Sequence, residues 1–335
     1  MLPGWDELVQ DVHVVALPMH VPFRGVLTRE AVLLRGPAGW GEFSPFPEYA
    51  DAESARWLAA AVEAAWAGWP PALRHRVPVN ATVPAVATRN VAGVLARFPG
   101  CTTAKVKVAQ CGQALSDDIA RVAEVRSVLG GGGRVRVDAN GAWSVEEALR
   151  GLTALSPYDL EYAEQPCATV TELAMLRAGL ARAGVPLLIA ADESVRKAAD
   201  PARVVLAGAA DVLVLKVAPL AGVRPALGIA AACGLPVVVS SALDTSVGIR
   251  AGIALAAALP DLPYACGLAT ASLFAADVVR RPLVPVGGVL PVSRIAPEEQ
   301  LLASSAAPPE RRRWWLERLR RCHGLLAAAA TDSGP

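Results

Sequence analysis

From about residue 76 onward, short apolar runs alternate with longer stretches rich in alanine and leucine, with a repeat of about 25–30 residues. This alternation is typical of strand–helix units around a parallel sheet. Eight strand-like runs in regular order favour a closed (β/α)7β TIM-like barrel of the α/β class over residues 76–284, rather than an open doubly wound sheet. The runs cover residues 77–82, 103–108, 134–138, 159–164, 186–192, 211–216, 236–241 and 264–269. Helical segments are expected at residues 87–98, 117–129, 145–155, 170–183, 223–232 and 249–259.

The segments on either side of this region have a different pattern. Residues 1–75 contain strand-like stretches at 11–17, 28–35 and 39–44 and a helical stretch at 53–69, which predicts a separate α+β module. Residues 285–335 contain a strand-like stretch at 288–292 and, after Pro308-Pro309, a basic helix at 310–326. We expect this C-terminal tail to pack against the N-terminal module.

Composition limits the possible partners. Hydrophobic residues make up 53% of the 335 residues, so a large core is expected and intrinsic disorder is excluded. Lys plus Arg is 32 and Asp plus Glu is 31, so no overall charge attracts nucleic acid or an anionic membrane. The interleaved Trp and Leu residues of the basic C-terminal helix favour docking on the protein over binding to nucleic acid. The expected partner is a small molecule, and the oligomeric state stays open, with a monomer among the options.

The cysteine pattern and the hydropathy indicate the compartment. Six cysteines occur singly without a CxxC pair, which disfavours a zinc site and a disulfide framework. The N-terminus lacks the pattern of a secretory signal, and no apolar run reaches the ~20 residues of a membrane span. We therefore expect a cytoplasmic protein.

Charged residues close five successive predicted strands, where the active sites of such barrels lie. No histidine occurs between residues 76 and 322, so a mechanism there has to work without imidazole. Lys105 and Lys107 are two positions apart in one strand, so both side chains point to the same face. The residues at the strand ends are Lys107, Asp138, Glu164, Asp192 and Lys216.

Three converging carboxylates predict a hard divalent cation, because like charges at close range are costly unless neutralised. Oxygen ligands without His or Cys favour Mg²⁺, with Mn²⁺ as a substitute. Lys107 and Lys216 then serve as base and acid, or as base and electrostatic stabiliser, on either side of a small carboxylate substrate. Metal charge and the neighbouring Lys105 lower the pKa of Lys107. The simpler structural interpretations are that Asp192 caps the N-terminus of a helix and that the lysine pair lies on a solvent-exposed face of its strand.

The motifs around these residues resemble the enolase superfamily, and within it the muconate-lactonising subgroup. The resemblance implies that the three acids bind Mg²⁺, that Lys107 and Lys216 flank the substrate, and that the metal stabilises an enediolate intermediate. It also implies that residues 1–75 and the tail form an α+β capping domain. The matching motifs are Ala104–Val108, Val137–Trp143, Tyr162–Pro166, Ala191–Ser194 and Leu215–Val217.

Three further stretches, at residues 19–25, 41–46 and 240–249, resemble the actinobacterial o-succinylbenzoate synthases of that subgroup. This implies syn elimination of water from 2-succinyl-6-hydroxy-2,4-cyclohexadiene-1-carboxylate in menaquinone biosynthesis, with Lys107 as the proton carrier. Lys105 is then expected to belong to the catalytic residues, with Lys107 and Lys216, and also to contact the substrate. Arg24, Ser240 and Ser241 are expected to contact the substrate. Asn140 is expected to lie directly behind the catalytic groups.

Other activities stay open. The run 266–271 has no Asp-x-Asp, which the dipeptide epimerases of the subgroup use to hold the substrate amine, so that activity is disfavoured. N-succinylamino acid racemisation uses the same two lysines and is the main alternative. A metal-binding barrel without catalysis is the non-enzymatic alternative.

Overall fold

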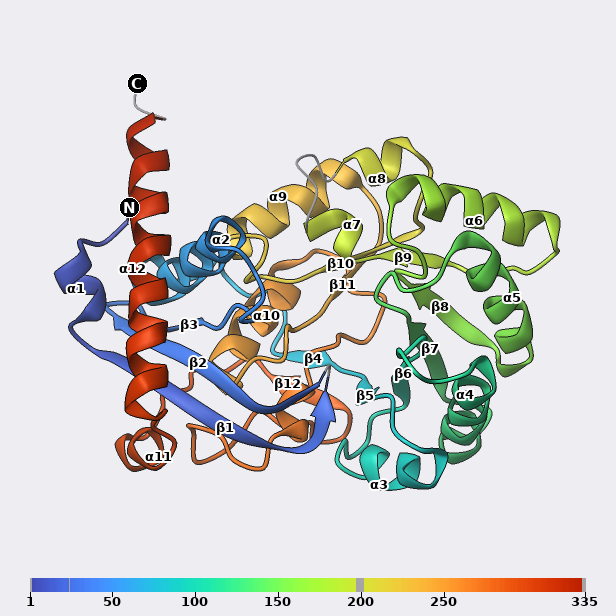
Figure 1. Cartoon of the computed structure of the whole chain (residues 1–335), viewed down its shortest axis with the longest axis horizontal. Coiled ribbons are helices and arrows are strands. Elements are labelled where there is room, and N and C mark those ends of the chain that lie inside the picture. The colour runs from blue at the N-terminus through green and yellow to red at the C-terminus, as the bar shows by residue number, and fades with distance from the viewer. Residues whose placement is uncertain (1, 24, 197–201, 333–335) are drawn as a thin grey trace.

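The computed structural model describes residues 2–23, 25–196 and 202–332. A barrel of parallel strands lies beside a smaller module of antiparallel sheet and helices (Figure 1). This arrangement confirms the predicted α/β TIM-like fold. Within the described residues, seven parallel strands follow one another around the barrel in chain order: β5 (Ala81–Val83), β6 (Thr103–Lys107), β7 (Arg134–Asp138), β8 (Leu160–Glu164), β9 (Ile189–Ala191), β10 (Val212–Leu215) and β11 (Val237–Val239).

The eighth predicted strand, residues 264–269, joins the two edges of this sheet through isolated bridges. Cys266 pairs with Val79 on one side, and Gly267 pairs with Ser240 on the other. Gly267 N donates to the carbonyl of Val239 at 2.9 Å, and Asn80 N donates to the carbonyl of Cys266 at 2.9 Å. The segment contains no β-branched residue before Thr270, which explains why it forms bridges in place of a regular strand.

The first predicted strand, residues 77–82, is divided into two. Arg76–Pro78 forms β4, which pairs antiparallel with β12 (Val289–Pro291), and the barrel strand β5 begins only at Ala81. The C-terminal tail therefore also contacts the start of the barrel.

Helices alternate with the strands on the outside of the barrel. The predicted helix at 87–98 is shorter in the structure, because Gly93 and the Pro99-Gly100 pair disfavour helix. Capping boxes start two of the longer helices: Ser144 precedes α5 and pairs with Glu147 in its first turn, and Thr169 precedes α6 and pairs with Glu172 in its first turn. The helical elements are the 3-10 turn η2 (Thr88–Asn90), α3 (Val91–Leu95), α4 (Leu115–Leu129), α5 (Val145–Leu155), η3 (Ser156–Tyr158), α6 (Val170–Arg182), α7 (Glu193–Arg196), α8 (Arg203–Leu206), α9 (Val223–Cys233), α10 (Ser246–Ala258) and η4 (Thr270–Leu273).

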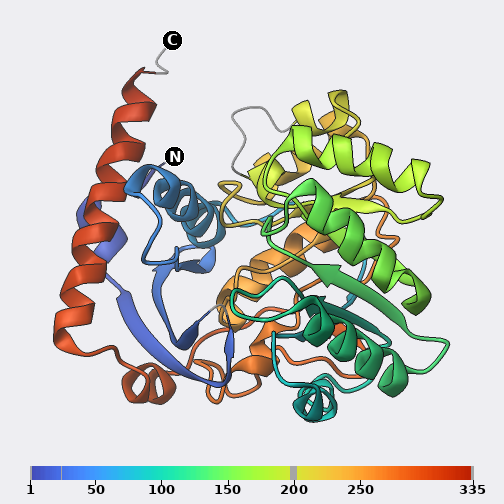
Figure 2. The same cartoon turned by 45° about the vertical axis from the view of Figure 1, so that its right-hand side comes forward.

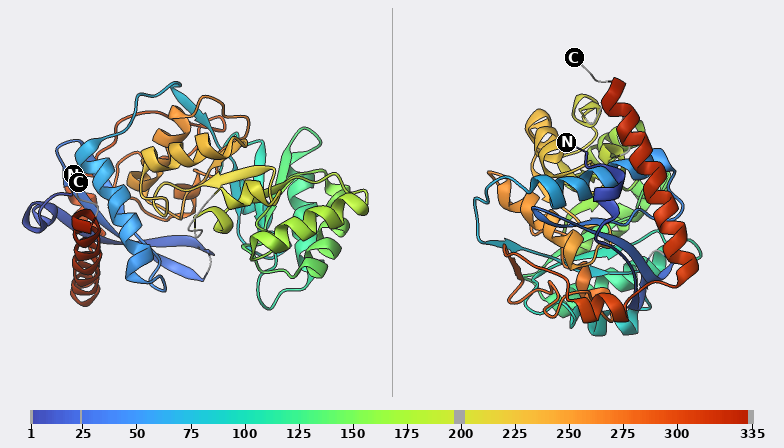
Figure 3. Two further views of the ribbon diagram at one scale, coloured as in Figure 1. Left: turned by 90° about the horizontal axis from the view of Figure 1, so that it is seen from above. Right: turned by 90° about the vertical axis from the view of Figure 1, so that its left-hand side faces the viewer.

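The smaller module combines the N-terminal residues with the end of the chain. Helix α12 packs along α2, and its buried Trp315 meets the Phe43 ring edge-on at 6.0 Å between ring centres. Figure 2 shows α12 on the outer side of the module, and in Figure 3 both termini lie at that end of the molecule. The elements of the module are α1 (Trp5–Val9), β1 (Val12–Phe23), β2 (Val26–Gly36), β3 (Gly39–Phe43), α2 (Asp51–Val62), the π-helix η1 (Glu63–Ala67), α11 (Glu299–Ser304) and α12 (Pro309–Asp332).

Two glutamates of the module bind the N-termini of barrel helices. Glu42 Oε2 accepts hydrogen bonds from Thr245 Oγ1 at 2.6 Å and Gly248 N at 2.9 Å, at the start of α10. Glu63 accepts from the main-chain N–H groups of Val223 at 2.5 Å and Arg224 at 3.1 Å, at the start of α9. Carboxylates are favoured at helix N-termini, so these contacts fix the module against the barrel. No helix in the described ranges is both long and apolar enough to cross a membrane.

Candidate active site

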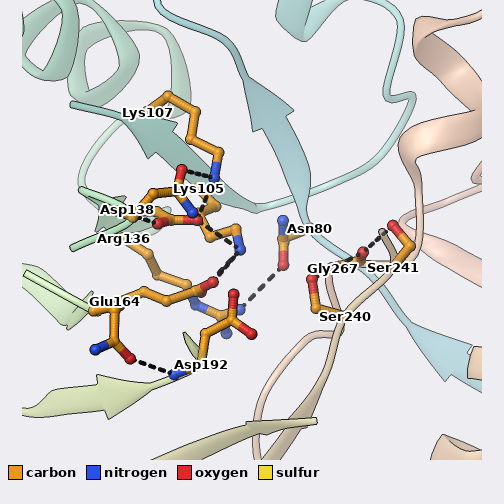
Figure 4. A network of polar contacts seen from close by, with 12 residues as sticks. Asn80, Lys105, Lys107, Arg136, Asp138, Glu164, Asp192, Ser240, Ser241 and Gly267 are labelled. Atoms are coloured by element: carbon orange, nitrogen blue, oxygen red, sulfur yellow. Dashed lines mark hydrogen bonds and ion pairs between the residues drawn. The ribbon is translucent and has the colours of Figure 1, made fainter. Parts of the chain in front are cut away.

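Three carboxylates lie at the ends of neighbouring strands. Asp138 closes β7, Glu164 closes β8 and Asp192 directly follows β9, and each is at most 1% exposed. Strand register places Lys107 opposite Asp138 and Asp138 opposite Glu164, so the side chains lie at one level of the barrel. Figure 4 shows Lys105, Asp138 and Glu164 turned toward one another.

Each carboxylate forms an ion pair with a lysine. Lys105 Nζ lies 2.7 Å from Glu164 Oε1 and 3.2 Å from Asp138 Oδ2. Lys107 Nζ lies 2.5 Å from Asp138 Oδ2, and Lys216 Nζ contacts Asp192 Oδ2. The lysines expected from the sequence to lie near the three acids therefore do so.

The buried charges shift one another's pKa values. Burial lowers the pKa of Lys107, and the nearby Asp138 opposes this only in part. Burial alone would also lower the pKa of Lys105, but Glu164 and Asp138 raise it above the ordinary value. Burial and the charge of Asp138 raise the pKa of Glu164 to about 7. Lys107 is thus the lysine of the pair that loses its proton more readily.

Local turns hold these strand ends in place. Gln165 Oε1 accepts from Asp192 N at 3.0 Å and Ser194 N at 3.1 Å, and its Nε2 donates to Ser194 Oγ at 2.7 Å. Asp138 Oδ1 accepts from Asn140 N at 3.0 Å. Asn140 has a φ of 49°, in the left-handed region that asparagine tolerates better than most residues. Strand spacing did not single out Gln165, although it directly follows Glu164.

The donor set suits a magnesium ion in its chemistry. Within the described part of the chain, no group of three or more Asp, Glu, His or Cys side chains is already arranged to hold a metal ion. The three acids bind lysines in this arrangement. Asp192 Oδ1 is buried and accepts no hydrogen bond from a described residue, although Arg196 Nε lies 3.3 Å away as an ion-pair partner. Carboxylate oxygens without nitrogen or sulfur donors are the ligands that Mg²⁺ prefers. The residues therefore fit Mg²⁺ in the chemistry of their oxygen donors.

A pocket opens beside the lysines. Among the residues predicted from the sequence, its lining includes Lys105, Lys107, Asn140, Lys216, Ser240 and Ser241. The two serines also hold the closing segment, since Ser241 Oγ donates to the carbonyl of Gly267 at 3.0 Å and lies 2.7 Å from Thr270 Oγ1. Arg24 lies outside the described residues.

The pocket also contains residues that the sequence did not single out. Thr82 could have been recognised, because it lies on β5, next to Lys105 of β6 in the strand register. The aromatic residues come from the N-terminal module, and their place could not be inferred from strand spacing. The additional lining residues are Phe23, Phe46, Tyr49, Trp57, Thr82, Arg196, Pro219, Ala242, Leu243, Gly267 and Thr270.

Comparison with known families matches most of the chain. Residues 88–297 match the family described as enolase C-terminal domain-like, and residues 14–65 match the family described as enolase N-terminal domain-like. Muconate lactonizing enzyme from Pseudomonas putida has a TM-score of 0.72 at 21% identity, covering 89% of this chain and 98% of that one. The enzyme from Pseudomonas fluorescens, complexed with muconolactone, has a TM-score of 0.73 at 23% identity with the same coverage. These structures show the shared fold.

Closer relatives share a single name. The o-succinylbenzoate synthase of Thermobifida fusca (strain YX) is 61% identical over 85% of this chain and 88% of its own length. The o-succinylbenzoate synthase of Mycolicibacterium smegmatis is 57% identical over 97% of this chain and 99% of its own length. The chain therefore belongs to the o-succinylbenzoate synthase family, within the enolase-like proteins.

Proposed function

We propose that this chain is a Mg²⁺-dependent dehydratase that converts 2-succinyl-6-hydroxy-2,4-cyclohexadiene-1-carboxylate to o-succinylbenzoate in menaquinone biosynthesis. The observation that carries this proposal is the 57% identity over 97% of the chain with the synthase of Mycolicibacterium smegmatis. The pocket supports it, because two lysines from separate strands line one cavity beside three buried acids.

In the proposed reaction, Lys107 acts as the base. Its neutral amine takes the proton from the ring carbon that bears the carboxylate. The C–H electron pair becomes part of a ring double bond, and the C–O bond to the hydroxyl group breaks. Lys107 returns its proton to the departing oxygen on the same side of the ring, so water leaves and the lysine ends neutral. The lowered pKa of Lys107 supports this role, because a base has to be unprotonated to act.

The other charged residues have supporting roles. Asp138, Glu164 and Asp192 would hold Mg²⁺, or Mn²⁺ as a substitute, and the cation supplies positive charge next to the substrate carboxylate. Lys216 carries an ammonium that stabilises the negative charge formed when the proton is removed. Lys105 is paired with Glu164 and Asp138, so it orients those acids as well as contacting the substrate.

Substrate contacts come from both parts of the molecule. We assign Lys105, Arg24, Ser240 and Ser241 to substrate binding. Residues 1–75 and the tail 285–335 form a capping domain on the barrel of residues 76–284. The aromatic side chains of Phe46, Tyr49 and Trp57 in the pocket lining support this division.

The expected setting is the cytoplasm, with a small carboxylate as the partner and no nucleic acid or membrane. All six cysteines are free in the structure, which agrees with a reducing compartment. Trp315 and Leu319 of the basic helix α12 are fully buried, which supports docking of this helix on the chain itself.

The decisive experiment follows the aromatic product by its ultraviolet absorbance when purified protein, Mg²⁺ and the cyclohexadiene substrate are mixed. Lack of product at saturating Mg²⁺ would rule out the synthase. A second assay in D₂O with an N-succinylamino acid tests racemisation, which the presence of Lys107 and Lys216 in one cavity also supports. Deuterium at the α-carbon shows racemase activity, and its absence shows a strict synthase. A barrel that binds Mg²⁺ and gives neither product would be a non-catalytic binder.

A further inference from the structure

A chain of polar contacts leads from Lys107 away from the pocket. Lys107 Nζ donates to Asn140 Oδ1 at 2.7 Å, and Asn140 Nδ2 donates to Glu193 Oε1 at 3.3 Å. Arg196 Nη2 donates to the same oxygen of Glu193 at 3.0 Å. Lys107, Asn140 and Arg196 line the pocket, whereas Glu193 joins them from the first position of α7.

The chemistry of the two neighbours fixes the orientation of the Asn140 amide. A lysine ammonium can only donate, and a carboxylate can only accept. Lys107 on one side and Glu193 on the other therefore allow one orientation, with Oδ1 toward the lysine and Nδ2 toward the glutamate. In its neutral form Lys107 has a lone pair that can also accept, so the acceptor at position 193 is then the group that keeps Oδ1 toward the lysine.

The Asn140 amide in turn limits how Lys107 Nζ is directed. A lysine amine has three positions besides its bond to carbon. Asp138 Oδ2 and Asn140 Oδ1 occupy two of them, at 2.5 and 2.7 Å. The remaining position is the one that can take a proton from a substrate in the pocket. Loss of the Asn140 contact would free Nζ to rotate away from the reacting carbon.

The contact chain continues into the N-terminal module. Arg196 is 4% exposed in its side chain, and its Nη1 lies 3.7 Å from Glu53 Oε1 on helix α2. Arg56 Nη1, also on α2, donates to the carbonyl oxygen of Arg196 at 3.4 Å. Helix α2 thus reaches the glutamate that orients Asn140 through a single buried arginine.

We propose that Glu193 and Arg196 are positioning residues that orient Asn140, and through it the amine of Lys107, and that they couple docking of helix α2 to proton transfer. This inference rests on the proposed function, in which Lys107 is the base. Glu193 lies outside the pocket lining, whereas Arg196 lines it and places its Nε 3.3 Å from Oδ1 of Asp192, one of the acids assigned to the cation.

The first test compares two substitutions of Glu193. Glu193→Ala removes the acceptor, so kcat should fall on the order of 10–100-fold while KM changes by less than about 3-fold. Glu193→Gln keeps an acceptor oxygen of the same shape, so kcat should recover to within about 5-fold of wild type. Full activity of Glu193→Ala overturns the inference, and so does a rise in KM that accounts for the whole effect.

The second measurement separates this role from an effect on the neighbouring Asp192. Mg²⁺ titration by calorimetry should give a Kd for Glu193→Ala within about 3-fold of wild type. Recovery of full activity at saturating Mg²⁺ would show that Glu193 acts on the cation site and would overturn the inference. A crystal structure of the variant should show the Asn140 amide turned away from Lys107, and an unchanged amide contradicts the proposal.

The third measurement tests the link to α2. Glu53→Gln and Arg56→Met together should lower kcat by about 3–5-fold, because Arg196 loses its side-chain contact with Glu53 and the hydrogen bond from Arg56 to its carbonyl oxygen. Glu63→Gln is the matched control: Glu63 also joins the module to the barrel, through Val223 and Arg224, but it has no contact with Arg196. An equal loss of kcat in Glu63→Gln would mean that general loosening of the module explains the effect, which overturns the coupling.

An inactive wild type would refute the proposed function, whereas an active wild type with an unaffected Glu193→Ala refutes only this inference.

Discussion

Arg29 Nε donates a hydrogen bond of 2.9 Å to the main-chain carbonyl of Leu243, 214 positions later in the chain. Arg29 also donates to the carbonyl of Ser44 and, at 3.4 Å, to that of Ala242. Leu243 has a φ of 64°, in the left-handed region that a branched residue occupies only with strain. Since Ala242 and Leu243 line the pocket, an arginine of the N-terminal module holds one wall of the site.

Arg29→Met should therefore affect both folding and substrate binding. The change leaves buried carbonyls without a donor, and we expect a loss of about 3 kcal/mol in the free energy of unfolding. KM should rise by about 10-fold, in line with loss of about 1.4 kcal/mol of binding. Urea unfolding and steady-state kinetics measure the two effects. Arg35→Met, at a side chain that is 62% exposed, is the control and should change stability by less than about 0.5 kcal/mol.

Lys107→Ala should abolish turnover while the protein stays folded. General base catalysis contributes about 10²–10⁴-fold, so the rate of product formation should fall by at least that factor. Circular dichroism and the urea midpoint check that the fold is intact. Retained full activity would remove Lys107 as the base.

Lys216→Arg tests whether charge alone is sufficient at the second lysine. Arginine keeps the positive charge, but its planar guanidinium differs in shape and does not lose its proton in proteins. We expect most of the activity to be lost, with kcat reduced by about 100-fold. Wild-type kcat in this variant would show that a cation of any shape serves at this position.

Removal of divalent cations should stop the reaction reversibly. Treatment with a chelator is expected to abolish product formation, and added Mg²⁺ or Mn²⁺ should restore it. Asp192→Asn should raise the Mg²⁺ concentration for half-maximal activity by at least about 10-fold, because it removes a negative ligand. Activity that persists in the chelator-treated protein would contradict the proposed cation site.

Acid should weaken the contact between Glu30 and the C-terminal helix. Burial raises the pKa of Glu30, but hydrogen bonds from Arg311 and Trp315 outweigh this and lower it below the ordinary value of 4.5. Because the folded-state pKa is the lower one, the stabilisation is complete above about pH 4.5 and is lost as pH falls through the folded-state pKa. Urea unfolding of wild type and Glu30→Gln should show a stability difference at pH 7 that narrows below pH ~4. A difference that is the same at both pH values would contradict this assignment.

The sequence alone determined the barrel and the charged residues at its strand ends. Apolar runs at a regular spacing predict parallel strands, and the period of two in a strand assigns Lys105 and Lys107 to one face. Because parallel strands end at the same edge of a sheet, Asp138, Glu164 and Asp192 could be expected to meet. These are local properties of short segments, so one sequence is enough to read them.

Only the tertiary structure decided how the rest of the molecule completes the site. Tyr49 and Trp57 reach the pocket from the N-terminal module, and Arg196 joins that module to Asn140 through Glu193. These contacts connect segments that are far apart in the chain, and no periodicity within either segment encodes them. Packing of the module onto the barrel, through carboxylates at helix N-termini and buried arginines, is the physical event that sets them.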